Sequence, residues 1–199
     1  MTCLNYTDRF FFFTDKLDNI IEKQINKFKN LSIVYKVEKD NLNINEFLKI
    51  KKFCKKKKIK IYFPDSIQKA IKLGADGLFI SSTNNKIYQL YKKSFKIIGS
   101  AHSQKEFYFK SKQKCNAIFL SPIFNNSKYS TNKILGLTKF NLISLYWKSN
   151  LIALGGINES NFNKIKYTKC FAIGFVSWFQ KSIIKKPVYF FKNTRAFIN

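Results

Sequence analysis

Eight short apolar segments recur along the chain, and their order limits the possible folds more than any other feature. Most of these segments are continuously apolar rather than alternating, which is typical of strands that are buried on both faces. Stretches with apolar residues at helical spacing lie between several of them. The expected strands are residues 10–14, 33–37, 59–63, 77–80, 97–98, 117–120, 151–154 and 171–176. This alternation predicts an α/β fold with a parallel sheet. We favour a compact, eight-stranded (β/α)8 TIM barrel over the alternative, an open doubly wound sheet.

The first three connections between strands are expected to be helical. In the third connection, Ser66 is a plausible N-cap and Gly74 a plausible terminating residue. The expected helices cover residues 17–28, 44–54 and 66–73. A length of 199 residues without a visible repeat or linker predicts a single domain over residues 1–199, with its core at about 10–185.

The composition excludes several classes of protein. Apolar residues make up 45% of the chain, which is too many for a disordered protein. No apolar run approaches the roughly 18 residues of a membrane span. Asp8 and Arg9 stand directly before the first aromatic run, where a secretory signal would have basic residues and then a longer apolar stretch. We therefore expect a cytoplasmic protein with no membrane partner.

The cysteines do not have the spacing of a structural metal site. Cys3, Cys54, Cys115 and Cys170 are more than 50 residues apart, and His102 is the sole histidine. Structural zinc sites use closely spaced pairs of Cys or His. Free thiols in a reducing compartment are the better interpretation.

The formal net charge of +26 raises the possibility of a nucleic-acid partner. However, Arg9 and Arg195 are the only arginines among the 37 basic residues. Arginine is the residue favoured for bidentate recognition of bases and phosphates, so its scarcity makes nucleic acid an unlikely partner. Solvated lysine faces explain the charge more simply. The positive field would still draw anionic metabolites towards a cleft.

Two glycine-containing segments follow the last two expected strands and point to a phosphate site. Gly155 and Gly156 form a pair that lets the backbone approach an anion closely and present its N–H groups. Val176 and Ser177 follow the eighth strand, where a helix amino terminus could add its dipole. Loops after the last two strands of a (β/α)8 barrel commonly form such a site.

Five short motifs resemble those of thiamine phosphate synthases and their TenI-like relatives in both order and spacing, and the chain looks like a divergent member of that family. The resemblance covers roughly residues 10–185 and is strongest from Lys72 onward. The motifs are Ala75–Leu78, Gly99–Ser103, Ser121–Phe124, Gly136–Leu137 and Ala153–Ile157. The resemblance implies a transferase that joins an aminopyrimidine pyrophosphate to a thiazole phosphate and releases pyrophosphate with the help of Mg²⁺. Its substrates would be small phosphorylated molecules.

The resemblance also implies roles for individual residues. The phosphate-binding residues would be Lys39, Ser127, Gly155, Gly156, Val176 and Ser177. Ser100 and Lys128 would lie at the reacting groups. Asp65 and Asn84 occupy the positions of the two Mg²⁺ ligands, although Asp65 could instead be the N-cap of the next helix. His102 is expected to be structural.

The chain departs from the family pattern mainly at the pyrimidine pyrophosphate. Tyr35 and Val37 replace a Gln and an Arg, and Pro64 replaces the Asn before the first metal-binding Asp. Asn84 is neutral where the family has the second Asp, which predicts weaker binding of Mg²⁺. Two alternatives remain open at this point. One is a thiazole tautomerase, whose sixth loop carries a His where this chain has Ser121-Pro122, and the other is a non-catalytic barrel that binds phosphate or RNA.

Overall fold

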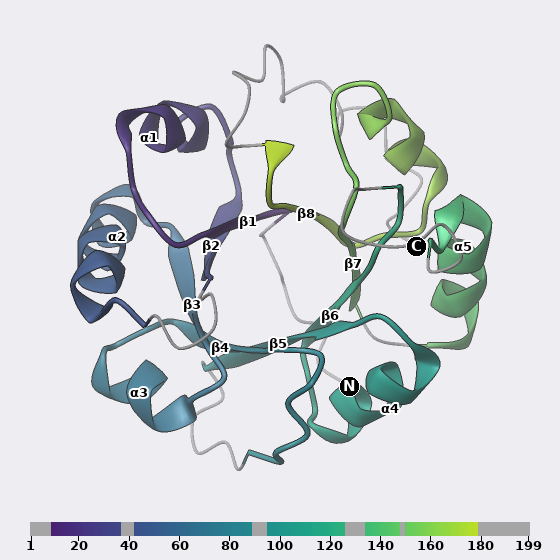
Figure 1. Ribbon diagram of the computed structural model, residues 1–199, viewed down its shortest axis with the longest axis horizontal. Helices are drawn as coiled ribbons and strands as arrows, with labels where there is room; N and C mark the ends of the chain where they lie inside the picture. The colour runs from purple at the N-terminus through teal and green to yellow at the C-terminus, as the bar shows by residue number, and fades with distance from the viewer. Residues whose placement is uncertain (1–8, 37–41, 89–94, 126–133, 148–149, 179–199) are drawn as a thin grey trace.

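The computed structural model shows eight parallel strands that close into a barrel, with helices around the outside (Figure 1). It describes residues 9–36, 42–88, 95–125, 134–147 and 150–178. Each strand pairs with the next, and β1 pairs with β8 to complete the ring. The strands are β1 (Phe10–Thr14), β2 (Leu31–Tyr35), β3 (Lys60–Pro64), β4 (Gly77–Ile80), β5 (Lys96–Ala101), β6 (Ala117–Leu120), β7 (Asn150–Ala153) and β8 (Ala172–Phe175). The prediction of a (β/α)8 barrel is confirmed, and the open sheet is excluded.

The outer ring consists of helices, most of which start at polar capping residues. In four of them, the side chain of the N-cap residue accepts a hydrogen bond from a backbone N–H of the first turn; these caps are Asp18, Asn43, Ser66 and Ser103. The helices are α1 (Asn19–Ile25), α2 (Ile44–Lys57), α3 (Ile67–Lys72), α4 (Gln104–Lys112) and α5 (Gly136–Tyr146), with a 3₁₀ helix, η2 (Phe162–Tyr167), between β7 and β8. Ser66 is the N-cap of α3 as expected, so the alternative role of Asp65 as that cap is wrong.

Alternation along the strands divides the core into two layers. Residues of one parity, including Phe11, Val34 and Phe119, fill the inside of the barrel. Residues of the other parity, including Tyr35 and Phe63, pack between the strands and the helices. Strands buried on both faces must be apolar at every position, which accounts for their continuous apolar sequences. The parity of a residue therefore tells whether its side chain faces the barrel or the helices.

Two elements near the amino terminus are placed differently from the sequence prediction. β2 begins at Leu31 because the N–H groups of Arg9 and Phe10 donate to the carbonyl of Asn30, at 2.9 and 3.2 Å. The expected strand thus lies two residues too far along the chain, and its last residue, 37, is outside the described residues. The first helix is shorter than expected because the chain leaves it through i→i+3 turns, in which Phe28 donates to the carbonyl of Ile25 at 3.1 Å.

Pro64 is the last residue of β3, one residue beyond the end of the expected strand at residues 59–63. The pairing of β3 with β2 has already ended at Tyr62, while Asp65 still donates to Phe79 of β4 at 2.8 Å. The missing N–H of Pro64 therefore removes no hydrogen bond from the sheet.

Three cysteines are described, and none of them forms a disulfide. Cys54 and Cys115 are buried, and Cys170 is half-buried. Burial raises the pKa of Cys54 and of Cys115 to about 12, and that of Cys170 to about 11. The prediction of free thiols is confirmed for these three, while Cys3 lies outside the described residues. No helix in the described ranges is long and apolar enough to cross a membrane.

Candidate functional site

The predicted site residues that the structure describes lie at or just beyond the carboxyl ends of strands. In a parallel barrel these ends form one rim, where enzymes of this architecture place their sites. Asp65 follows β3, Asn84 follows β4, Ser100 lies in β5, Gly155 and Gly156 follow β7, and Val176 and Ser177 follow β8. Lys39, Ser127 and Lys128 lie outside the described residues, so their roles stay predictions.

The two glycines after β7 have backbone conformations that other residues rarely adopt. Gly155 has a φ of +89° and Gly156 a φ of +73°. A Cβ on Gly156 would lie 2.3 Å from the carbonyl oxygen of Phe124, and one on Gly155 would lie 2.9 Å from Cα of Pro122. The pair is therefore required for close packing of the β7 loop against the β6 loop.

The same backbone leaves hydrogen-bond donors at the rim. Within the described part of the chain, the N–H groups of Gly155, Gly156, Val176 and Ser177 make no backbone hydrogen bond. Ser177 is exposed, while Trp178 after it is buried against Phe162 and Phe175 and holds the loop in place. Adjacent backbone donors on a fixed loop are suited to an anion such as a phosphate.

Asp65 has a strained backbone and a well-defined set of partners. Its φ of +52° lies in the left-handed region, which is uncommon for residues other than glycine and often marks a functional site. Its Oδ1 accepts hydrogen bonds from the backbone N–H of Ser81 at 2.8 Å and from Nδ2 of Asn84 at 2.9 Å. Tyr88 donates its hydroxyl to the backbone carbonyl of Asp65 at 3.0 Å. The β3 and β4 loops are thus joined at the predicted metal position.

Asn84 presents its amide nitrogen, and not its oxygen, to Asp65. The nitrogen also donates to the hydroxyl of Tyr88 at 2.8 Å, while Oδ1 accepts from the backbone N–H of Lys86 at 2.9 Å. No group of three or more His, Cys, Asp or Glu side chains that could hold a metal occurs among the described residues. Among the residues that line the pocket at this point of the rim, Asp65 is the one that carries a carboxylate. It suits Mg²⁺, which is usually bound through one or two carboxylates together with phosphate oxygens of a substrate.

A buried lysine fixes the segment that carries Asn84. Lys110 of α4 is fully buried, and its Nζ donates to the carbonyl of Asn84 at 2.7 Å. Nε2 of Gln113 donates to the same carbonyl at 2.9 Å and to that of Lys86 at 2.7 Å. Burial lowers the pKa of Lys110 from its ordinary value. Gly99 makes room for this side chain, since a Cβ there would lie 2.9 Å from Cδ of Lys110.

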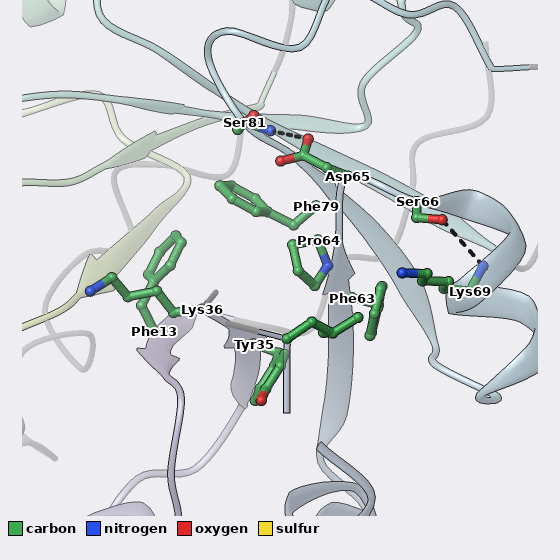
Figure 2. Close-up of a pocket in the computed structure, with 11 residues that line it drawn as sticks. Phe13, Tyr35, Lys36, Phe63, Pro64, Asp65, Ser66, Lys69, Phe79 and Ser81 are labelled. Carbon is green, nitrogen blue, oxygen red and sulfur yellow. Dashed lines mark hydrogen bonds between the residues drawn. The ribbon is translucent and has the colours of Figure 1, made fainter. Parts of the chain in front are cut away.

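A pocket opens beside Asp65, over the carboxyl ends of β1 to β4 (Figure 2). Its volume is about 310 Å³. Phe79 is a half-buried aromatic residue of the lining, Phe13 and Phe63 are almost fully buried in its walls, and Asp65 is the single anionic residue in the lining. The remaining lining residues are Tyr35, Lys36, Leu42, Pro64, Ser66, Lys69 and Ser81. Such a mixture suits a ligand with a flat ring and a charged group.

Ser100 and His102 have different environments at the end of β5. Ser100 is nearly buried, and its parity is that of Ile98, which faces the inside of the barrel. Nδ1 of His102 lies 2.9 Å from Oγ and 3.0 Å from the carbonyl oxygen of Ser121, so the ring connects the β5 and β6 loops. These contacts support the structural role expected for His102.

Three lysines of this region were missed in the sequence. Lys36 directly follows Tyr35 of the altered β2 motif and has the same parity as Val34. This alternation along the strand was the signal that could have identified Lys36 as a residue facing the barrel. Lys69 was hidden in the helical pattern of α3. Lys110 could not be found, since a lysine among many at helical spacing gives no sign of burial.

Comparison with known proteins relates the whole barrel to one family. The family model described as "Thiamine monophosphate synthase" matches residues 13–179. A thiamine-phosphate synthase of Prochlorococcus marinus is 35% identical over 133 residues, which are 64% of this chain and 38% of that protein. One of Clostridium acetobutylicum is 31% identical over 134 residues, which are 65% of this chain and 63% of that protein. The matched segments thus span less than two thirds of either relative.

Two solved structures with the same fold carry related names. The thiamine phosphate pyrophosphorylase of Pyrococcus furiosus superposes with a TM-score of 0.67 at 16% identity, covering 87% of both chains. That of Bacteroides thetaiotaomicron gives a TM-score of 0.55 at 17% identity, covering 92% of this chain and 90% of the other. At this level of identity the superpositions establish the fold alone. The match of the family model to residues 13–179, which is most of the barrel, shows that the chain belongs to the thiamine monophosphate synthase family.

Proposed function

We propose that this protein is a thiamine phosphate synthase. It would couple an aminopyrimidine pyrophosphate to a thiazole phosphate, with the barrel core at about residues 10–185 acting as one functional domain. The observation that carries the proposal is the pair of loops after β7 and β8. There, Gly155, Gly156, Val176 and Ser177 present backbone N–H groups that are not used within the described residues. These donors would hold the phosphate of the thiazole.

The reaction requires little from the side chains as acids or bases. The bond between the pyrimidine methylene carbon and the pyrophosphate oxygen breaks, and the pyrophosphate leaves with the electron pair. The lone pair of the thiazole nitrogen then forms the new C–N bond, so that no proton has to move. What the protein must supply is orientation of the two rings and stabilisation of the leaving anion. A site with a single histidine engaged by Ser121 is compatible with this chemistry.

Mg²⁺ would be held by Asp65 together with phosphate oxygens of the substrate. When bound, it would offset the charge of the departing pyrophosphate. Asp65 would orient the phosphates through the ion, and the bonds from Ser81 and Asn84 would fix the carboxylate. Ser100 would lie near the reacting groups, with Lys39, Ser127 and Lys128 as further phosphate-binding or catalytic candidates from segments outside the described residues.

The arrangement of Asn84 favours a second candidate, a barrel that binds phosphates without turnover. Its amide nitrogen bonds Asp65 directly, so the pair needs no metal to be held together. An assay of both thiamine precursors, with and without Mg²⁺, separates the two functions. Mg²⁺-dependent formation of thiamine phosphate is expected. Binding of thiazole phosphate without any turnover would support the non-catalytic barrel instead.

Ser177→Asp tests the phosphate loops directly. A carboxylate beside the backbone donors should repel the phosphate and weaken the binding of thiazole phosphate at least tenfold, about 1.4 kcal/mol. Isothermal calorimetry measures this affinity. Asn26→Asp, at the carboxyl end of α1, adds the same charge at a distance from these loops and should leave the affinity unchanged. Equal losses in the two variants would show that the effect comes from the overall charge and not from this site.

A further inference from the structure

The pocket beside Asp65 contains two cations that are not among the residues to which the family resemblance assigns a role. Among its lining residues, Lys36 and Lys69 carry positive charge. In Figure 2 the two side chains stand on different sides of the pocket, Lys36 beside Phe13 and Lys69 towards Phe63. The family's arginine position is occupied by the neutral Val37.

The pairing of β1 with β2 sets the direction of the Lys36 side chain. Its backbone N–H donates to the carbonyl of Thr14 at 2.9 Å, which extends the pairing of β1 and β2 by one residue. Tyr35 faces outwards and packs against Phe47 and Phe63. Lys36 therefore has the opposite parity, that of Val34, and its side chain faces the mouth of the barrel.

Lys69 comes from the first helical turn after β3. Its backbone N–H donates to Oγ of the N-cap Ser66, which fixes the start of the side chain. Lys69 is exposed, so its ammonium group keeps its hydration until a ligand arrives. Figure 2 shows the side chain extending from α3 towards Phe63 and Pro64 at the edge of the pocket.

The chemistry of the first substrate calls for cations at this place. A pyrophosphate ester carries several negative charges, and the carboxylate of Asp65 in the same pocket adds another. Lysine ammonium groups on flexible stems bind phosphates as point charges and need no fixed planar geometry. We propose that Lys36 and Lys69 bind the pyrophosphate group of the pyrimidine substrate, with the ring against the aromatic side chains, in place of the arginine that the β2 motif lacks. This assignment rests on the proposed function for the identity of the substrate.

A pair of double variants with equal change in charge tests the assignment. Lys36→Met with Lys69→Met removes the two pocket lysines. Lys23→Met with Lys72→Met removes two exposed helical lysines that do not line the pocket. Calorimetry with inorganic pyrophosphate in the presence of Mg²⁺ measures binding without turnover. Steady-state kinetics measures KM for each substrate, and thermal melting checks that all forms are folded.

The pocket double variant should bind pyrophosphate at least tenfold more weakly than the unmodified protein, and the control double variant should stay within twofold. KM for the pyrimidine substrate should rise while KM for thiazole phosphate stays constant. Lys69→Arg should retain most of the binding. Equal weakening in both double variants, no weakening in either, or no binding of pyrophosphate by the unmodified protein overturns the assignment. If pyrophosphate binding is lost only in the pocket variant but no form makes thiamine phosphate, the proposed synthase fails and the anion site stands.

Discussion

At the residue scale, the amide nitrogen of Asn84 faces Asp65, the carboxylate that we propose as the Mg²⁺ ligand. That nitrogen, Nδ2, lies 2.9 Å from Oδ1 of Asp65, so a donor faces an acceptor. Asn84→Asp replaces that donor with a second carboxylate oxygen. Without Mg²⁺ the two anions repel, and we expect a destabilisation of about 2 kcal/mol, equivalent to a fall in Tm of about 5 °C. Melting with and without Mg²⁺ measures the effect.

Mg²⁺ should restore the Tm of Asn84→Asp much more than it changes that of the unmodified protein. The Mg²⁺ concentration needed for half-maximal turnover should also fall, since two carboxylates bind the ion more tightly than one. Asn84→Ala serves as the control, because it removes the hydrogen bond without adding charge. The same Mg²⁺ response in both variants would separate Asn84 from the metal position.

Gly156 and Gly136 form a matched pair of variants for testing the proposed phosphate-binding loop after β7. Both have positive φ, +73° and +66°, but a Cβ on Gly136 would meet nothing within 4 Å. Gly136→Ala should therefore cost about 1 kcal/mol for backbone conformation alone. Gly156→Ala adds a clash with the carbonyl of Phe124, and we expect about 3 kcal/mol in total together with loss of thiazole-phosphate binding. Urea denaturation compares the two, and equal costs would contradict the packing role of Gly156.

At the scale of elements, α4 holds the β4 loop through a buried cation. Lys110→Met keeps the length of the side chain but removes the bond to the carbonyl of Asn84. The change also removes the cost of burying the ammonium group, and Gln113 still donates to the same carbonyl, so global stability should change by less than about 1 kcal/mol. Amide hydrogen exchange in residues 81–88 should nevertheless become faster. Unchanged exchange would show that Gln113 alone is sufficient to hold the loop.

The sequence predicted the strands better than the residues that connect them. A strand buried on both faces leaves a continuous apolar run, and Gly155 and Gly156 stand out because few residues accept their backbone conformation. The position of β2 was two residues off, since its start depends on hydrogen bonds from Arg9 and Phe10 to Asn30. Contacts between distant segments leave no local signal at all, and Lys110 with Asn84 is such a contact.

At the scale of the whole molecule, the lysines are distributed around the outer ring. Among the described residues, each of the helices α1 to α5 and also η2 carries at least one. A cluster on one face would have favoured a nucleic-acid partner, whereas this distribution agrees with solvated surfaces. The field that reaches the rim is then the sum of many distant charges, and salt screens such a field strongly.

Closure of the barrel has a consequence for how the protein opens. A strand in a closed ring has two neighbours, so none can detach without breaking two rows of hydrogen bonds. Cys54, in the helix before β3, and Cys115, two residues before β6, should therefore become accessible in the same event. With pKa values of about 12, both thiols are about a thousandfold less ionised at pH 8 than a thiol of ordinary pKa near 9.

Labelling of the native protein with a thiol reagent would measure the rate at which the barrel opens and exposes these cysteines. In Cys3→Ser, mass spectrometry should find the half-buried Cys170 modified first, followed by Cys54 and Cys115 at one common rate. Faster modification of Cys54 would mean that α2 detaches while the ring stays intact. Equal modification rates of Cys54 and Cys115 would show that the barrel opens as one cooperative unit, and different rates would show that it opens in parts.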